Sequence, residues 1–148
     1  MEKSLLTILV AEDSAADAEM TIDALHEANL ANPIVHVEDG VEAMDWLLRR
    51  GAWAGREDGH PSLVLLDIKM PRMDGLEVLK RMRADDNLRH IPVVILSSSR
   101  EERDLARSWD LGVNAYVVKP VDVHQFFDAV QTLGQFWGVL NEAPDGRG

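Results

Sequence analysis

The sequence predicts an α/β fold in which a five-stranded parallel sheet lies between two layers of helices. Five short apolar runs alternate with longer segments whose apolar residues recur at helical spacing. The apolar runs are nearly continuous, as expected for parallel strands that are buried on both faces. The chain has 148 residues, which suits one domain better than two.

The predicted strands are short runs rich in Val, Ile and Leu, and they span residues 5–11, 34–37, 63–67, 91–96 and 115–118. A helical segment follows each run. Repeated strand–helix units place successive strands parallel in one sheet, with the helices as crossovers.

The first three helices have recognisable starts. Ser14 and Asp17 match the capping box that opens a helix. An apolar stripe over residues 41–48 predicts the second helix, and Asp74 is a favoured cap for the third. Residues 50–62 are rich in Gly and predict an extended loop between the second helix and the third strand.

The last two helices are predicted in the same way. Two overlapping capping boxes over residues 98–102 open the fourth helix, to which Leu105 and Trp109 add apolar side chains. The final helix is predicted over residues 122–140, and residues 143–148 are expected to form a flexible tail.

Composition excludes several classes of function. With 15 Lys and Arg against 26 Asp and Glu, the net charge is −11, which repels phosphate backbones and argues against binding to nucleic acid or anionic membranes. The absence of Cys excludes disulfides and fits a reducing compartment. No run approaches the roughly 20 apolar residues of a membrane span, and residues 1–10 lack the features of a signal peptide. We therefore expect a cytoplasmic protein.

Polar residues gather where four predicted strands end. Glu12 and Asp13 follow the first strand, Asp67 ends the third, Ser97 follows the fourth and Lys119 follows the fifth. Ligands of open parallel α/β sheets bind outside the carboxyl ends of the strands. We therefore expect these five side chains to meet at one edge of the sheet.

The chemistry of this set favours phosphoryl transfer. Clustered carboxylates repel one another unless a cation lies among them. Hard oxygen ligands favour Mg²⁺ or a similar ion, which commonly takes a phosphate as a further ligand. Lys119 offers a positive charge to an anion, and the Ser97 hydroxyl can donate to a phosphoryl oxygen. Together these residues describe a carboxylate that accepts a phosphoryl group.

Two segments resemble response-regulator receiver domains. Residues 67–75, Asp-Ile-Lys-Met-Pro-Arg-Met-Asp-Gly, resemble the family signature D-x-x-M-P-x-M-D-G. Residues 111–120 resemble the approach to the family's Lys-Pro dipeptide, with Tyr116 at an aromatic switch position. The resemblance implies a flavodoxin-like (CheY-like) three-layer sandwich with strand order 2-1-3-4-5. It also implies a stand-alone receiver domain over residues 1–142, which acts as the response regulator of a two-component system.

The resemblance further implies roles for the residues at the strand ends. Asp67 is expected to be the phosphoacceptor, and a histidine kinase is expected to donate the phosphoryl group. Asp13, Asp67 and the backbone carbonyl of Lys69 are expected to bind Mg²⁺ (or Mn²⁺) directly, while Glu12 acts partly through water.

Lys119 is expected to hold a phosphoryl oxygen. Ser97 and Tyr116 are expected to move on phosphorylation and to reshape the face formed by the fourth helix, the fifth strand and the fifth helix.

Many receivers carry a neutral or acidic residue where this chain has Lys69. Because a Lys side chain across the phosphoryl group would hinder the attacking water, we expect slow self-dephosphorylation.

Two features point to a subgroup of the family. Residues 51–61 are longer than the corresponding segment of a minimal receiver, and similar inserts occur in single-domain regulators that work with bacterial phytochromes. One face of a helix needs about three apolar residues in seven, and the predicted last helix has more, namely Phe126, Phe127, Val130, Leu133, Phe136, Trp137 and Leu140. The surplus favours a partner protein or a homodimer.

Two other functions are compatible with parts of the pattern. A Mg²⁺-dependent phosphatase or phosphotransferase would use a similar site, but such enzymes usually have a second acidic residue where this chain has Lys69. A phosphorylation-independent interaction module would keep the fold without the complete polar set. We therefore expect a switch that catalyses only its own phosphorylation and dephosphorylation. The sequence leaves the isomer of the Lys119–Pro120 bond open.

Overall fold

The computed structural model describes residues 7–28, 32–57 and 59–131. Its strands are β1 (Ile8–Ala11), β2 (Ile34–Val37), β3 (Leu63–Asp67), β4 (Val93–Ser97) and β5 (Ala115–Val118). They form a five-stranded sheet in the order β2-β1-β3-β4-β5, and every pair of neighbours is parallel. The predicted fold class and strand order are confirmed.

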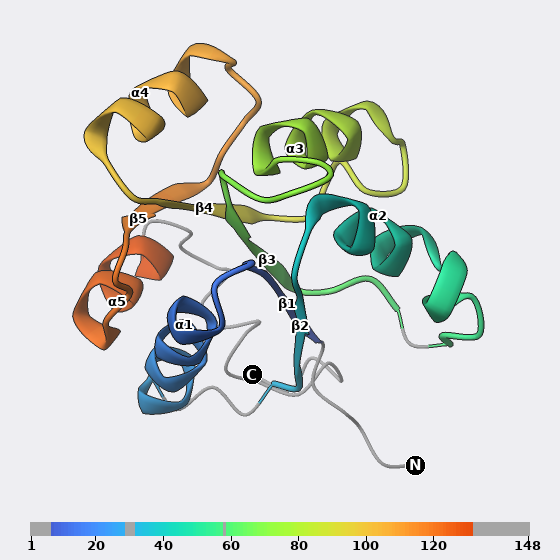
Figure 1. Cartoon of the computed structure of the whole chain (residues 1–148), viewed down its shortest axis with the longest axis horizontal. Helices are drawn as coiled ribbons and strands as arrows, with labels where there is room; N and C mark the ends of the chain where they lie inside the picture. Colours follow the sequence, from blue (N-terminus) through green and yellow to red (C-terminus); the bar gives the residue numbers. More distant parts are fainter. Residues whose placement is uncertain (1–6, 29–31, 58, 132–148) are drawn as a thin grey trace.

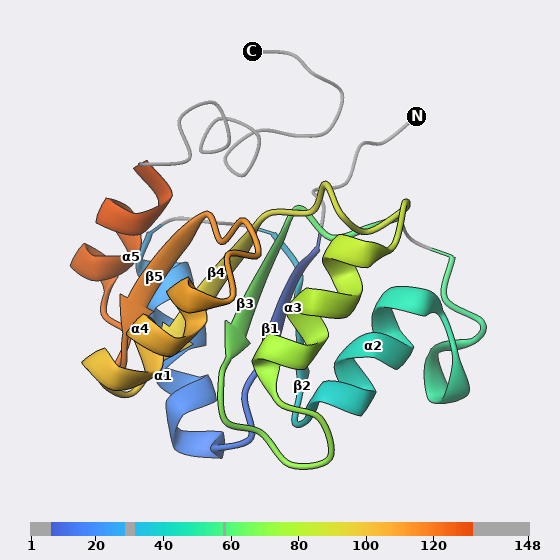
Figure 2. The ribbon, with the colours of Figure 1, turned by 90° about the horizontal axis from the view of Figure 1, so that it is seen from above.

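Helices cover both faces of the sheet (Figure 1). Helices α1 (Ala15–Glu27) and α5 (Val123–Gln131) lie on one face, and α2 (Gly40–Leu48), α3 (Gly75–Ala84) and α4 (Arg100–Ser108) lie on the other. Figure 2 shows α2 and α3 in front of the strands and α1 behind them. A short 3₁₀ helix, η1 (Gly51–Trp53), follows α2 within the predicted extended loop.

Each face of the sheet has its own apolar core, because successive residues of a strand point to opposite faces. Leu9 and Val64 pack with the residues beneath α2 and α3. Their neighbours Ile8 and Leu65 pack with the residues beneath α1 and α5. Burial on both faces is the reason why these strands read as continuous apolar runs.

Side-chain caps start the helices close to the strand ends. Ser14 Oγ accepts a hydrogen bond from the Asp17 N–H at 3.2 Å. The reciprocal bond of a capping box is replaced, because the Ser14 N–H donates to Glu12 Oε2 at 3.1 Å. Ser99 Oγ caps α4 by accepting from the Glu102 N–H at 3.2 Å. Ser14 and Ser99 therefore cap their helices as predicted, whereas Ser98 is no cap and its N–H donates to Glu102 Oε1 at 2.8 Å. Each capping box thus forms only in part.

Several element boundaries differ from the prediction or lie outside the described residues. Strand β4 spans Val93–Ser97, whereas residues 91–96 were predicted. The first strand begins at Ile8, and residues 1–6 are outside the described part. Helix α4 ends at Ser108, and the side chains of Leu105 and Trp109 are exposed instead of packing in the core. Helix α5 is described as far as Gln131, so the predicted continuation to residue 140 and the predicted tail also lie outside. Within the described ranges, no helix has the length and apolar character needed to cross a membrane.

Candidate functional site

The predicted polar residues converge at the carboxyl ends of the strands. Glu12 and Asp13 directly follow β1, Asp67 is the last residue of β3, Ser97 is the last residue of β4, and Lys119 directly follows β5. The register pairs Asp67 with Leu96 and Ser97 with Val118, so these strand ends lie at the same level of the sheet. The strand positions that the sequence predicted are therefore brought together by the fold.

Three carboxylates form the centre of the site. Glu12, Asp13 and Asp67 each place a carboxylate oxygen within 4.8 Å of the others. Glu12 and Asp67 are buried, whereas Asp13 is exposed. Two buried carboxylates and one accessible carboxylate at this spacing form a pocket of hard oxygen ligands that is open on one side.

Lys119 is the cation that balances these carboxylates. Its Nζ lies 3.1 Å from Glu12 Oε1, 3.2 Å from Asp67 Oδ2 and 3.2 Å from Asp17 Oδ2. Sequence reasoning treated Asp17 as part of a helix cap and missed this contact. The available signal was its place in the first turn of α1, the helix that follows β1. One ammonium therefore joins β1, β3 and α1 to β5.

Burial and the neighbouring carboxylate perturb the phosphoacceptor candidate. Burial, together with the hydrogen bond to Glu12 and its negative charge, raises the pKa of Asp67 from 3.8 to about 7, although Lys119 acts in the opposite direction. Burial alone would lower the pKa of Lys119, but Asp67 and Glu12 outweigh it and raise that pKa above its ordinary value. The site thus holds more negative charge than one lysine neutralises.

Two buried polar atoms in the site lack hydrogen-bond partners within the described part of the chain. They are Asp67 Oδ1 and Ser97 Oγ, and each belongs to the last residue of its strand. Buried polar atoms are normally satisfied, so an orphaned carboxylate oxygen beside two further carboxylates fits a divalent cation or an electrophile. The residues present therefore fit a metal ion of the Mg²⁺ class.

The turn after Asp67 depends on a glycine. The Gly75 N–H donates to the Ile68 carbonyl at 2.8 Å, and a Cβ atom at position 75 would overlap the backbone oxygen of Asp67. Asp74 caps α3 by accepting from the Glu77 N–H at 2.9 Å, as predicted. The Asp-Gly pair of the signature therefore closes the loop tightly beneath Asp67.

Two predicted site residues have their partners on α4. The Lys69 side chain is 79% exposed, and its Nζ lies 3.5 Å from Glu102 Oε2 on α4. Tyr116 lies on β5, partly buried, with the Arg107 guanidinium 5.1 Å from its ring centroid. Burial raises the pKa of Tyr116. The peptide bond between Lys119 and Pro120 is cis.

A parallel sheet with an acidic pocket and a lysine at the carboxyl ends of its strands places this protein in the class of receiver domains. Residues 8–131 match the response regulator receiver domain family, and the chain belongs to this family. The resemblance inferred from the sequence is therefore confirmed.

The relatives of the chain include regulators of phytochrome signalling. This chain is 35% identical to the response regulator Rcp1 of Synechocystis over 130 residues, which cover 88% of this chain and 87% of Rcp1. Among solved structures, the bacteriophytochrome response regulator RtBRR is 51% identical with a TM-score of 0.87, covering 96% of this chain and 86% of RtBRR. The bacteriophytochrome response regulator AtBRR is 55% identical with a TM-score of 0.86, covering 94% of this chain and 99% of AtBRR. The Mn²⁺-bound form of Rcp1 is 34% identical with a TM-score of 0.71, covering 89% of this chain and 94% of Rcp1. The protein is thus a receiver-type response regulator with phytochrome response regulators among its homologues.

Proposed function

We propose that this protein accepts a phosphoryl group from a histidine kinase on Asp67 and thereby switches a protein-docking surface. The observation that carries the proposal is Asp67 Oδ1, which is buried and unpartnered beside two carboxylates and the Lys119 ammonium. An acceptor oxygen must be free to form a bond, and its surroundings must neutralise the incoming charge.

The transfer step uses the residues of this pocket. The Asp67 carboxylate attacks phosphorus, an O–P bond forms, and the bond from phosphorus to the kinase imidazole breaks. The electron pair of that bond stays on the ring, which is protonated on its other nitrogen and leaves as neutral imidazole. Lys119 holds a phosphoryl oxygen as charge develops. Ser97 Oγ, which has no other partner among the described residues, donates a hydrogen bond to the new phosphoryl group.

The pocket suits Mg²⁺ or Mn²⁺. Glu12, Asp13, Asp67 and the backbone carbonyl of Lys69 would hold the ion, with Glu12 acting partly through water. A bound divalent ion supplies charge neutralisation for the carboxylates and for the transferred phosphoryl oxygens. The orphaned Asp67 oxygen and the Mn²⁺-bound form of the relative Rcp1 support this assignment.

Incubation with Mg²⁺ and acetyl phosphate, followed by intact mass measurement, tests the proposal. The protein should gain one phosphoryl group, and both Asp67→Asn and EDTA should abolish the gain. Asp86→Asn, a matched change at a side chain that is 89% exposed, should leave the gain intact. If the wild-type protein stays unphosphorylated under these conditions, the result would favour a phosphorylation-independent interaction module. Steady hydrolysis of simple phosphoesters would favour a Mg²⁺-dependent phosphatase or phosphotransferase.

Identities of 51% and 55% to bacteriophytochrome response regulators support a phytochrome kinase as the partner. The insert packs against α2, since the Arg56 guanidinium lies 3.7 Å from the Trp46 ring centroid. Purified phytochrome kinases should transfer phosphate to this protein faster than unrelated histidine kinases do. Equal rates would contradict the link. The cytoplasmic location and the domain limit at residue 142 stay predictions.

We also propose that the switched surface is formed by α4, β5 and α5 and that it supports a homodimer. A groove of about 460 Å³ on this face is lined by Arg103 and Arg107 of α4 and by Asp128 of α5, among others. Opposite charges on one face are self-complementary across a twofold axis. The exposed Trp109 adds apolar surface at the end of α4. Sedimentation should show phosphorylation-dependent dimers that Arg107→Glu weakens, and a monomer in both states would refute this surface.

A further inference from the structure

Glu102 is a buried carboxylate close to the site that the transfer step does not use. It lies in the first turn of α4, and the residue is 7% exposed. Its Oε1 accepts a hydrogen bond from the Ser98 N–H at 2.8 Å. Its Oε2 lies 3.5 Å from the Lys69 Nζ. Each carboxylate oxygen therefore has a partner in a different loop.

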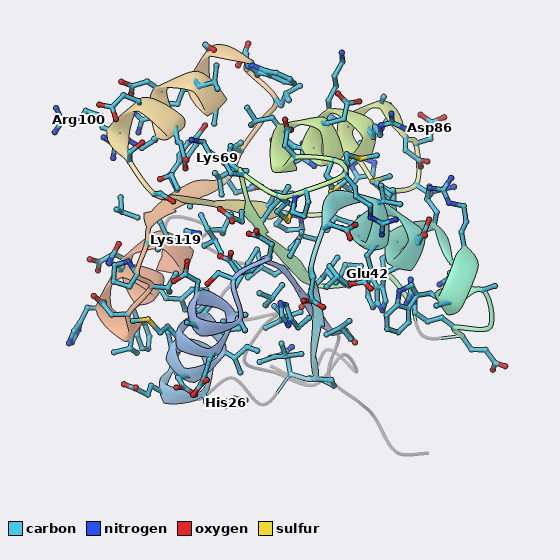
Figure 3. The ribbon with its side chains drawn as sticks, in the orientation of Figure 1. His26, Glu42, Lys69, Asp86, Arg100 and Lys119 are labelled. Atoms are coloured by element: carbon cyan, nitrogen blue, oxygen red, sulfur yellow. The ribbon has the colours of Figure 1, made fainter. Side chains whose placement is uncertain are left out.

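These two loops both begin at the site. Lys69 lies two residues after Asp67, and Ser98 directly follows Ser97. Figure 3 places Lys69 on the side of the sheet covered by α4, whereas Lys119 approaches from the opposite side. Glu102 therefore connects the loop after Asp67 to the loop that directly follows Ser97.

The position of the Lys69 ammonium depends on a balance of charges. Its side chain is long, flexible and 79% exposed, so little packing restrains it. Before phosphorylation, Lys119 already pairs with Asp67, and Glu102 holds Lys69. Phosphorylation changes a carboxylate of one negative charge into a group that carries close to two. The attraction of the site for Lys69 therefore rises while that of Glu102 stays constant.

We propose that Glu102 is a positioning residue that competes with the phosphoryl group for Lys69. In the unphosphorylated protein, Glu102 holds the ammonium away from Asp67 and fastens Ser98. When Lys69 moves to the phosphoryl group, the buried Glu102 carboxylate loses its cation and the loop that directly follows Ser97 is loosened. This inference rests on the proposed phosphorylation of Asp67 and describes how that site is regulated.

A double-mutant cycle on the lifetime of the phosphorylated protein tests the inference. Glu102→Gln keeps an oxygen that can accept from the Ser98 N–H but removes the charge that holds Lys69. The freed ammonium should cover the phosphoryl oxygens and hinder the attacking water, which lengthens the half-life of the phosphoryl group roughly fivefold or more. With Lys69→Gln already present, Glu102→Gln should change the half-life less than twofold. Glu77→Gln, a charge-matched change in an α3 ion pair, should have no effect in either background.

The outcomes separate this inference from the proposed function. If the wild-type protein gains no phosphoryl group from acetyl phosphate, the proposed function fails. If it gains one but Glu102→Gln has the same effect with and without Lys69, Glu102 is merely structural and the inference is wrong. Should Glu102→Gln fail to fold, Glu102→Asp replaces it in the cycle, because its shorter side chain withdraws the carboxylate from Lys69. The same coupling and the same refutation then apply.

Discussion

Replacing Asp67 by Asn should stabilise the folded protein at alkaline pH in the absence of divalent ions. The wild-type carboxylate is 2% exposed and lies beside the buried Glu12, so its ionised form is unfavourable in the folded state. An uncharged amide of the same shape removes this repulsion. The effect on stability should therefore be opposite to the effect on phosphorylation, which we expect Asp67→Asn to abolish.

The magnitude follows from the pKa of Asp67. A rise from 3.8 to about 7 corresponds to about 4 kcal/mol, since one pKa unit is worth about 1.4 kcal/mol. Between these two pH values the folded protein binds more protons than the unfolded chain, so wild-type stability falls as the pH rises. The attraction of Lys119, whose Nζ lies 3.2 Å from Asp67 Oδ2, is already contained in this pKa. We therefore expect the gain in stability from Asp67→Asn to be larger at pH 8 than at pH 5 by about 2 kcal/mol.

Urea denaturation in EDTA at pH 5 and pH 8 measures this difference. A gain of about 2 kcal/mol should move the urea midpoint by about 1 M, because m is about 2 kcal/mol/M for a domain of this size. Asp86→Asn is the control and should shift the midpoint little at either pH. Adding Mg²⁺ at pH 8 should stabilise the wild-type protein more than Asp67→Asn, since the ion prefers ionised carboxylates. Equal stability of Asp67→Asn and wild type at pH 8 would refute the argument.

The remaining predictions concern three other positions. Lys119→Met leaves two buried carboxylates without their shared cation, so in EDTA it should lower the free energy of unfolding by about 3 kcal/mol. Urea titrations measure this loss, and Mg²⁺ should partly restore the stability of the variant. In Gly75→Ala the new Cβ atom would push against the backbone oxygen of Asp67, so this change should slow phosphorylation by acetyl phosphate about tenfold or more. Gly55→Ala, with open space around it, should not slow it. Arg83 donates to four backbone carbonyls, so Arg83→Met should lower the midpoint of thermal unfolding by several degrees. Arg81→Met removes only a surface ion pair and should lower this midpoint far less. Equal shifts for the two variants would contradict this prediction.

Much of this protein follows from local patterns. Continuous apolar runs predicted the strands, and polar residues at their carboxyl ends predicted the site, because a parallel strand is apolar wherever both its faces are covered. Caps such as Asp74 act within one turn of a helix, so their partners are close in the sequence. The exposure of Leu105 and Trp109 could not be predicted in this way, because an apolar stripe does not reveal whether another element covers it.

The sequence by itself determined the succession of strands and helices and the identity of the chemical groups at the strand ends. The tertiary structure decided which of these groups meet. Lys119 bonds to a carboxylate 107 residues away, and Glu102 joins two loops that both leave the site. The pKa of Asp67 is also a property of the assembled fold, because burial and the approach of Glu12 arise when separate strands pack side by side. Such long-range contacts are set by packing in three dimensions, which no local pattern encodes.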